Sequence, residues 1–148
     1  RFMLGVSSGP CALPSLFGKP MVCTNLAPVG PLPTTKNSLV IPKLHWSDRE
    51  QRFMRTSEVL SSPVAAAFYH DMYRKAGIAV VDNSPEEIRE VTVEMIDVLQ
   101  GRISYSQADE QFQLKFRQRW NSQVPPSLWG GRNRLGREFL RRHAFLSE

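Results

Sequence analysis

Cysteine is scarce in this chain of 148 residues, which contains only Cys11 and Cys23. The two cysteines form no CxxC motif and accompany no cluster of histidines, so no metal site is predicted. Such low usage is typical of a cytosolic protein. Cys23 lies in an apolar run typical of a buried strand, and a disulfide between the two cysteines stays an open alternative.

Apolar runs are also short: none approaches the roughly 18 residues of a transmembrane helix, and Phe2–Val6 is too short for the core of a signal peptide.

The usual signatures of catalysis are missing as well. The sequence contains no nucleophile elbow, no Walker loop and no HExxH motif. Its histidines have no serine, cysteine or paired carboxylate at a spacing typical of catalysis: His45, His70 and His143. The sequence therefore predicts a binding surface rather than a catalytic centre, and it identifies no catalytic residue.

Acidic residues are absent from the first 46 positions, which carry four basic side chains. Residues 47–101 have a net charge of −4 and residues 102–148 one of +5, so the formal net charge of the chain is +5. The basic ends predict either an anionic ligand or an ordinary solvated surface. A nucleic-acid partner is not favoured, because the aromatic residues follow helical spacing and do not alternate with basic residues on a strand.

Composition predicts one packed domain over residues 1–148. Hydrophobic residues make up 41% of the sequence and charged residues 22%, which is ordinary for a globular domain. The chain begins with Arg1 inside an apolar run and not with an initiator methionine. We therefore expect this domain to be the C-terminal part of a longer protein.

The first segment of the chain predicts a β-α-β unit. Phe2–Val6 and Met21–Thr24 are apolar runs typical of buried strands, and Cys11–Phe17 between them predicts a short helix. Such a unit implies parallel strands with a right-handed crossover. Two more strands are predicted at Ser38–Ile41 and Ile78–Val81. We expect an α/β fold, a Rossmann-like three-layer domain with a small parallel sheet and flanking helices.

Caps and apolar periodicity predict five further helices. They span about Ser47–Leu60, Val64–Lys75, Pro85–Leu99, Ser106–Trp120 and Leu135–Phe145. The second has a repeating face that includes Phe68 and Tyr69, and the third begins at a capping box formed by Ser84 and Glu87. The fourth carries aromatic residues at every fourth position, which predicts core packing: Phe112, Phe116 and Trp120. The proline-rich stretch of residues 25–37 predicts a loop.

Ligands of parallel α/β sheets bind beyond the carboxyl ends of the strands, and candidate side chains follow three predicted strands. Ser7, Ser8 and Gly9 follow the first strand, where Gly9 would let the backbone approach a ligand and amides opening the next helix could hold a phosphate. Asn25 follows the second strand. Lys43 follows the third and could pair with an anion. A plain turn and a solvated lysine are the alternative interpretations.

Several segments in order resemble the donor-binding half of GT-B glycosyltransferases, in particular a bacterial family that builds surface carbohydrate of the lipopolysaccharide or capsule type. That family has a G-[TS]-[ST]-S-G…P…FGKP…N-x-x-P pattern. The matching segments span nearly the whole chain: Leu4–Pro10, Pro14, Leu16–Met21, Thr24–Pro28, Ser38–Lys43, Glu58, Asp82–Ile88 and Gly136–Leu146.

The resemblance implies a domain that binds a nucleotide-diphosphate-sugar donor against a missing N-terminal domain, without a metal and without a resident cofactor. It places Ser7, Ser8 and Gly9 near the donor diphosphate. The chain departs from the pattern at a glutamate that meets the ribose in many GT-B enzymes, because Leu13 stands there. Glu58 is the substitute we predict for ribose binding. The resemblance also implies a cytoplasmic enzyme, or one at the inner face of the membrane, whose catalytic base lies in the missing half, so this part alone would be inactive.

Two other interpretations stay open. The same fold could belong to a sugar-nucleotide epimerase or a polyol-phosphate transferase, both of which also use a Ser-Gly turn after a strand. Alternatively, the chain could be a non-catalytic basic domain that binds nucleic acid or a protein partner through the arginines of residues 102–142. The nucleotide base, the sugar and the acceptor are not identified.

Overall fold

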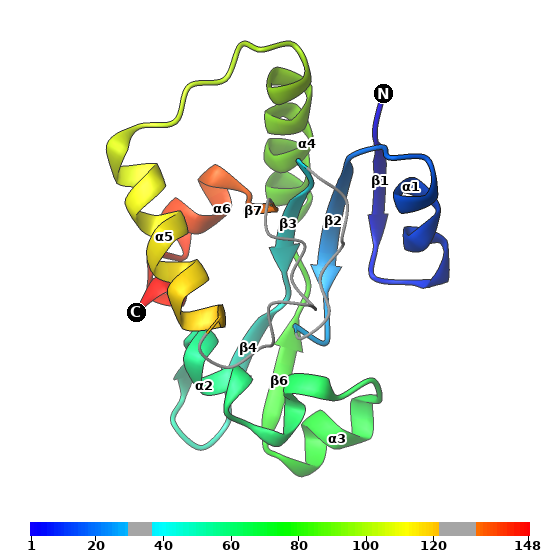
Figure 1. Ribbon diagram of the computed structural model, residues 1–148. Coiled ribbons are helices and arrows are strands. Elements are labelled where there is room, and N and C mark those ends of the chain that lie inside the picture. Colours follow the sequence, from blue (N-terminus) through cyan, green and yellow to red (C-terminus); the bar gives the residue numbers. More distant parts are fainter. Residues whose placement is uncertain (30–36, 122–132) are drawn as a thin grey trace.

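A small parallel sheet forms the centre of the molecule (Figure 1). The computed structural model describes residues 1–29, 37–121 and 133–148. The strand order of the sheet is β1-β2-β3-β7, and neighbouring strands are parallel. Its strands are β1 (Met3–Val6), β2 (Met21–Leu26), β3 (Leu39–Pro42) and β7 (Arg134–Leu135). Helices flank this sheet, which confirms the predicted α/β fold and the arrangement of a Rossmann-like three-layer domain.

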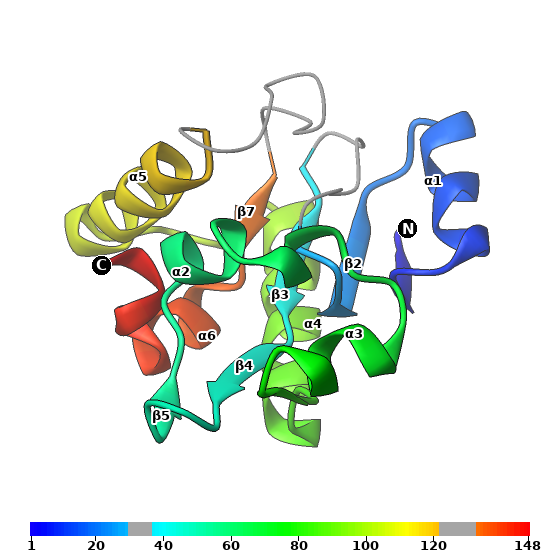
Figure 2. The ribbon, with the colours of Figure 1, turned by 90° about the horizontal axis from the view of Figure 1, so that it is seen from below.

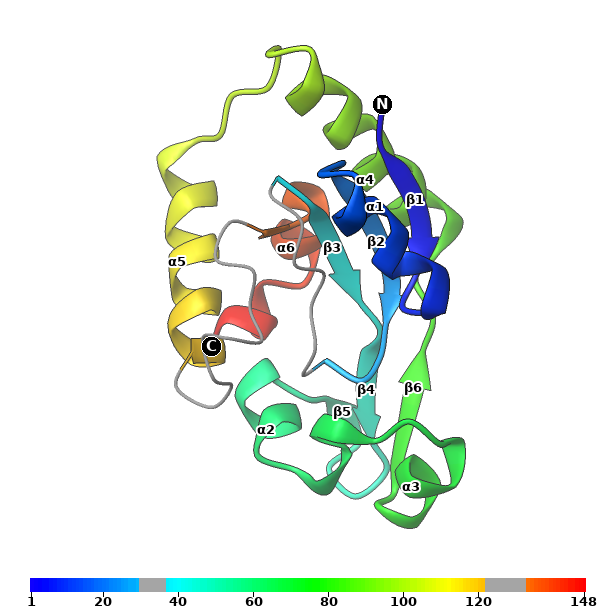
Figure 3. The same cartoon turned by 45° about the vertical axis from the view of Figure 1, so that its right-hand side comes forward.

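The predicted β-α-β unit is confirmed, with Met3 opposite Met21 in the register of β1 and β2. The helical connection is shorter than expected: a 3₁₀ helix η1 (Gly9–Ala12) leads into one turn of α-helix, α1 (Leu13–Leu16). Helix α1 lies in front of the sheet and α4 (Pro85–Leu99) lies behind β2 and β3 (Figure 3).

The two cysteines are both free thiols, so no disulfide links them. Cys23 is fully buried in β2, and this burial raises the pKa of its thiol to about 12. Cys23 is therefore a core residue, as its apolar neighbours in the sequence predict. Of the loop predicted over residues 25–37, residues 30–36 lie outside the part that the structure describes.

A second, antiparallel sheet continues directly from β3. Its strand order is β5-β4-β6, with β4 (Leu44–Ser47), β5 (Arg52–Phe53) and β6 (Ile78–Val81). The helix predicted to begin at Ser47 is wrong in its first half, because β4 and β5 form a hairpin there and α2 spans only Thr56–Leu60. Cross-strand packing holds the hairpin, since the rings of Trp46 and Phe53 meet edge to face with centroids 5.2 Å apart.

The helix predicted over Val64–Lys75 is interrupted. A 3₁₀ helix η2 (Pro63–Ala66) and helix α3 (His70–Lys75) are separated by extended backbone at Ala67 and Tyr69. The interruption turns the predicted apolar face outward: the residues that pack into the core are Val64, Ala67 and Tyr73, whereas Phe68 and Tyr69 are exposed.

The two long helices agree with their sequence patterns. Helix α4 begins at the predicted capping box, in which the Ser84 hydroxyl accepts from the Glu87 amide at 3.2 Å and the Glu87 carboxylate accepts from the Ser84 amide at 2.7 Å. In helix α5 (Gln107–Asn121) the aromatic repeat is confirmed as core packing, since Phe116 and Trp120 are each 1% exposed.

The last predicted helix is shorter than expected and begins later. Leu135 belongs to β7, and the helical residues divide into α6 (Arg137–Arg142) and a 3₁₀ helix η4 (Ala144–Ser147). Seen from below, α5 and α6 lie together on one side of the molecule and α1 lies at the opposite side (Figure 2).

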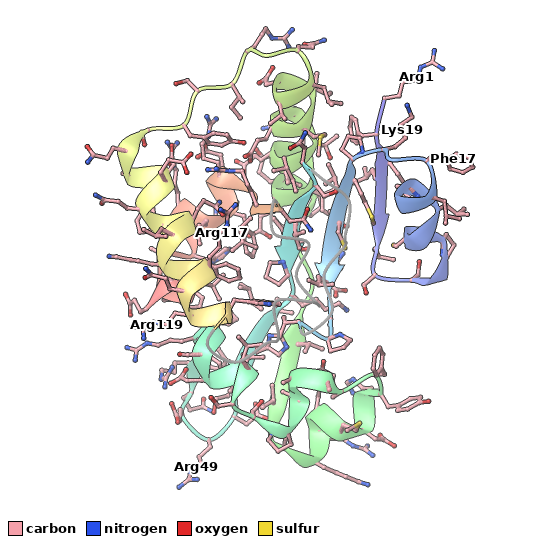
Figure 4. The ribbon with its side chains drawn as sticks, in the orientation of Figure 1. Arg1, Phe17, Lys19, Arg49, Arg117 and Arg119 are labelled. Atoms are coloured by element: carbon pink, nitrogen blue, oxygen red, sulfur yellow. The ribbon has the colours of Figure 1, made fainter. Side chains whose placement is uncertain are left out.

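One edge of the parallel sheet has no neighbouring strand among the described residues. Strand β1 is the edge strand, and its side chains Leu4 and Val6 are about half exposed. Beside it, α1 and the turn that follows expose Leu16 and Phe17, and Phe17 projects outward together with Arg1 and Lys19 (Figure 4). No helix within the described residues is long and apolar enough to cross a membrane.

Candidate functional site

A pocket lies where the carboxyl ends of β1, β2 and β3 face the segment before α3. Its volume is about 410 Å³, within the usual range of small-molecule sites. The residues that line it are Val6, Ser7, Asn25, Ala27, Lys43, Ala67, Phe68, His70, Tyr73, Val80 and Asp82. We call it the strand-end pocket.

Three of the six predicted site residues meet in the strand-end pocket. Ser7 comes from the end of β1, Asn25 from β2 and Lys43 from the junction between β3 and β4. The parallel arrangement of three adjacent strands explains this convergence, because their carboxyl ends lie at one edge of the sheet.

Ser8 and Gly9 follow Ser7 in an exposed turn but do not line the pocket. The Ser8 amide already donates to the Cys11 sulfur at 3.3 Å, and the Cys11 thiol donates to the Val6 carbonyl. The helical segments after this turn are four residues each, so they add little dipole to the site. A phosphate at this helix N-terminus would therefore receive less support from the helix dipole than a longer helix gives.

Glu58 is not brought to the strand-end pocket. It lies in α2, where its carboxylate accepts two hydrogen bonds from the Arg52 guanidinium, at 2.6 and 2.9 Å, and one from the Arg55 amide at 2.7 Å. The hydrogen bonds from Arg52 lower the pKa of Glu58 to about 2, against a smaller opposing effect of burial. These bonds satisfy the carboxylate where it caps α2, so the structure gives Glu58 no place beside a ligand of the pocket.

Lys43 carries the positive charge of the pocket. Its ammonium lies 2.6 Å from a carboxylate oxygen of Asp82, and the side chain of Asp82 is 72% exposed. Exposed ion pairs are weak, since water competes with both partners. An anionic ligand could therefore displace Asp82 from Lys43.

A pair of asparagines fixes the rim of the pocket. The Asn25 amide donates to Asn83 Oδ1 at 2.6 Å, and the Asn83 amide donates to Asn25 Oδ1 at 2.7 Å. Asn83 Nδ2 also donates to the Pro42 carbonyl at 2.9 Å, so one buried side chain joins the ends of β2, β3 and β6. Asn25 has a φ of 51°, a left-handed conformation that asparagine tolerates better than most residues. Its Nδ2 makes no hydrogen bond to the described residues and can serve a ligand.

The sequence interpretation missed the residues on the far side of the pocket. Phe68, His70 and Tyr73 come from the segment expected to be one continuous helix, and Asp82 follows the strand that joins the second sheet. One feature of the sequence could have indicated a binding role for this segment: the run Phe68-Tyr69-His70 places three residues with rings next to one another.

A second pocket, of about 570 Å³, lies between α5 and the C-terminal residues and contains none of the predicted site residues. The four arginines of residues 133–148 all form ion pairs, with N···O distances of 2.7 to 2.9 Å. The pairs are Arg134–Glu110, Arg137–Glu138, Arg141–Asp109 and Arg142–Glu90. Glu90 lies outside residues 102–148, so its pair with Arg142 lowers the positive charge available to a polyanion below the net charge of that segment.

Arg49 lies beside the β4–β5 turn (Figure 4), away from these pairs. Arg117 donates to the Asn133 carbonyl at 3.1 Å, and burial lowers the pKa of its guanidinium. No group of three or more histidine, cysteine, aspartate or glutamate side chains in the described part of the chain is placed to hold a metal ion.

Comparison with known proteins identifies no relative: no family model matches the chain, and no curated protein and no solved structure is significantly similar to it.

Proposed function

We propose that the strand-end pocket binds the diphosphate of a nucleotide-sugar, and that this domain is the donor-binding half of a metal-independent glycosyltransferase of surface-polysaccharide biosynthesis. The observation that carries the proposal is the convergence of Ser7, Asn25 and Lys43 from the ends of three adjacent parallel strands on one pocket. The resemblance of the strand-end segments to the GT-B donor half supports the choice of ligand.

In this proposal, Lys43 stabilises the negative charge that develops on the leaving nucleoside diphosphate. The Ser7 hydroxyl and Asn25 Nδ2 donate hydrogen bonds to phosphate oxygens, which are stronger with a charged acceptor. Asp82 holds Lys43 in place until the diphosphate displaces it. The acceptor and the catalytic base come from another domain of the longer protein that we predict.

Calorimetric titration with UDP, GDP and CDP tests the proposal. We expect Lys43→Ala to weaken binding by about tenfold, because a hydrogen bond to a charged group is lost. Asp82→Asn should strengthen binding, since it removes the anion that competes for Lys43. Lys19→Ala is the matched control, because Lys19 is an exposed lysine of the same acid-free segment that does not line the pocket.

Unchanged affinity in Lys43→Ala, or equal losses in Lys43→Ala and Lys19→Ala, would show that any binding is general attraction to a basic surface. The absence of binding by all three nucleotides at millimolar concentration would overturn the proposal for this domain.

A further inference from the structure

Two neighbouring aromatic side chains are exposed beside the strand-end pocket. Phe68 is 72% exposed and Tyr69 is 75% exposed, whereas large apolar side chains normally bury part of their surface in the core. Only Phe68 lines the pocket. Because Phe68 and Tyr69 are equally exposed but only Phe68 lines the pocket, substituting each in turn distinguishes a role in the pocket from exposure alone.

The backbone on both sides of Phe68 is anchored. The Tyr73 hydroxyl donates to the Ala67 carbonyl at 2.9 Å, and Ala67 and Tyr73 are 1% and 4% exposed. Burial raises the pKa of Tyr73, so its hydroxyl stays protonated and keeps donating this bond at neutral pH. The ring of Phe68 therefore projects from a fixed position and not from a free loop, which lowers the entropy cost of using it for binding.

The pocket has two chemically different sides. Ser7, Asn25 and Lys43 present hydrogen-bond donors and positive charge at the strand ends, and Phe68 presents an aromatic ring on the opposite segment. A ligand that satisfies both sides carries an anionic group and a flat ring. Base–aromatic stacking contributes roughly 1–3 kcal/mol per base in nucleic-acid complexes, and it tolerates every base because each has a π face.

We propose that Phe68 is the stacking surface for the nucleobase of the ligand whose diphosphate lies at Lys43. This proposal rests on the proposed function and adds the site that recognises the nucleoside. Stacking on a phenyl ring reads no hydrogen-bonding edge, so the side chain of Phe68 contributes affinity for UDP, GDP and CDP alike.

The test compares UDP with inorganic pyrophosphate, which lacks the base, on the whole chain. The wild-type protein should bind UDP more tightly than pyrophosphate. In Phe68→Ala we expect about a tenfold loss of UDP affinity and no change in pyrophosphate affinity. Phe68→Trp should retain UDP binding. Tyr69→Ala is the matched control and should leave both affinities unchanged, because it removes an equally exposed ring that lies outside the pocket.

The outcomes separate this inference from the proposed function. If UDP binds and Lys43→Ala weakens it while Phe68→Ala does not, the stacking role is wrong and the diphosphate site stands. Equal affinities of the wild-type protein for UDP and pyrophosphate would also overturn the stacking role alone. If neither ligand binds, both proposals fall. A circular-dichroism melting curve of Phe68→Ala that matches the wild type shows that the fold is unchanged.

Discussion

At the scale of single residues, a buried polar group can serve either the fold or a ligand, depending on what it already contacts. Asn83 contacts three strand ends, and its Nδ2 already donates to the Pro42 carbonyl, whereas Asn25 Nδ2 makes no hydrogen bond to the described residues. Glu58 resembles Asn83 and not Asn25. The sequence predicts it as a ribose acceptor, but both of its carboxylate oxygens accept hydrogen bonds from Arg52. Sequence alone identifies the residue type but not these competing partners.

His45 packs beside Tyr73, one of the residues that line the strand-end pocket, with ring centroids 5.9 Å apart. It is 4% exposed, and its Nε2 has no hydrogen-bond partner among the described residues. Burial lowers the pKa of His45 from 6.5 to about 4, although a hydrogen bond to the Lys43 backbone opposes the shift. Between these two pH values the unfolded chain therefore binds a proton that the folded protein does not.

This difference in proton binding predicts that the free energy of unfolding decreases as the pH is lowered. The contribution of His45 to the free energy of unfolding is complete above pH 6.5 and is lost as the pH decreases toward 4, by roughly 3 kcal/mol at most. His45→Leu should remove this part of the pH dependence. Urea unfolding of both proteins at several pH values from 7 to 4 measures it. If the free energies of unfolding of the wild type and the variant changed equally between pH 7 and pH 4, the prediction would be contradicted.

At the scale of elements, length decides what the sequence reveals. Helices α4 and α5 have 15 residues each, and their apolar periodicity and capping signals are repeated often enough to predict them. Strands β5 and β7 have two residues each and carry no such pattern. The β4–β5 hairpin replaces a predicted helix because the pairing of Trp46 with Phe53 is a tertiary contact that local propensity does not contain.

The same limit explains which site residues were found. Ser7 and Asn25 belong to the ends of the two strands of the predicted β-α-β unit, and Lys43 follows the next predicted strand, so the general placement of ligands beyond parallel strand ends identified all three. Phe68 and Asp82 reach the pocket through an interrupted helix and an antiparallel strand, and only the tertiary structure shows that these meet the strand ends.

Among the described residues, a side chain and not another strand covers the outer edge of β7. Gln113 of α5 donates to the Leu135 carbonyl at 2.7 Å and accepts from the Leu135 amide at 3.2 Å, and both residues are almost fully buried. The side-chain amide thus makes the two hydrogen bonds that a neighbouring strand would make, which closes this edge to further pairing.

Removal of this protection should destabilise the protein. We expect Gln113→Leu to lower the free energy of unfolding by on the order of 2–4 kcal/mol, because two buried backbone groups lose their partners. Gln111→Leu is the matched control on the same helix and should change stability little, since Gln111 is exposed. Chemical denaturation of both variants measures the difference, and equal stabilities of the two variants would refute the role of Gln113.

At the scale of the whole molecule, charge is arranged differently at the two ends of the sequence. The acid-free first 46 residues supply five of the residues that line the strand-end pocket, among them Ser7, Asn25 and Lys43. The arginines near the C-terminus are largely neutralised by acidic partners from α4, α5 and α6. A small anion held at the strand ends therefore fits this distribution better than a long polyanion along the C-terminal helices.

An NMR titration of the ¹⁵N-labelled protein with UDP shows directly where the nucleotide binds. We expect amide shift changes that saturate at Ser7, Asn25, Lys43 and Phe68, around the strand-end pocket, with α5 unaffected. Changes confined to α5 and the C-terminal arginines, or no changes at millimolar UDP, would rule out a nucleotide site at the strand ends.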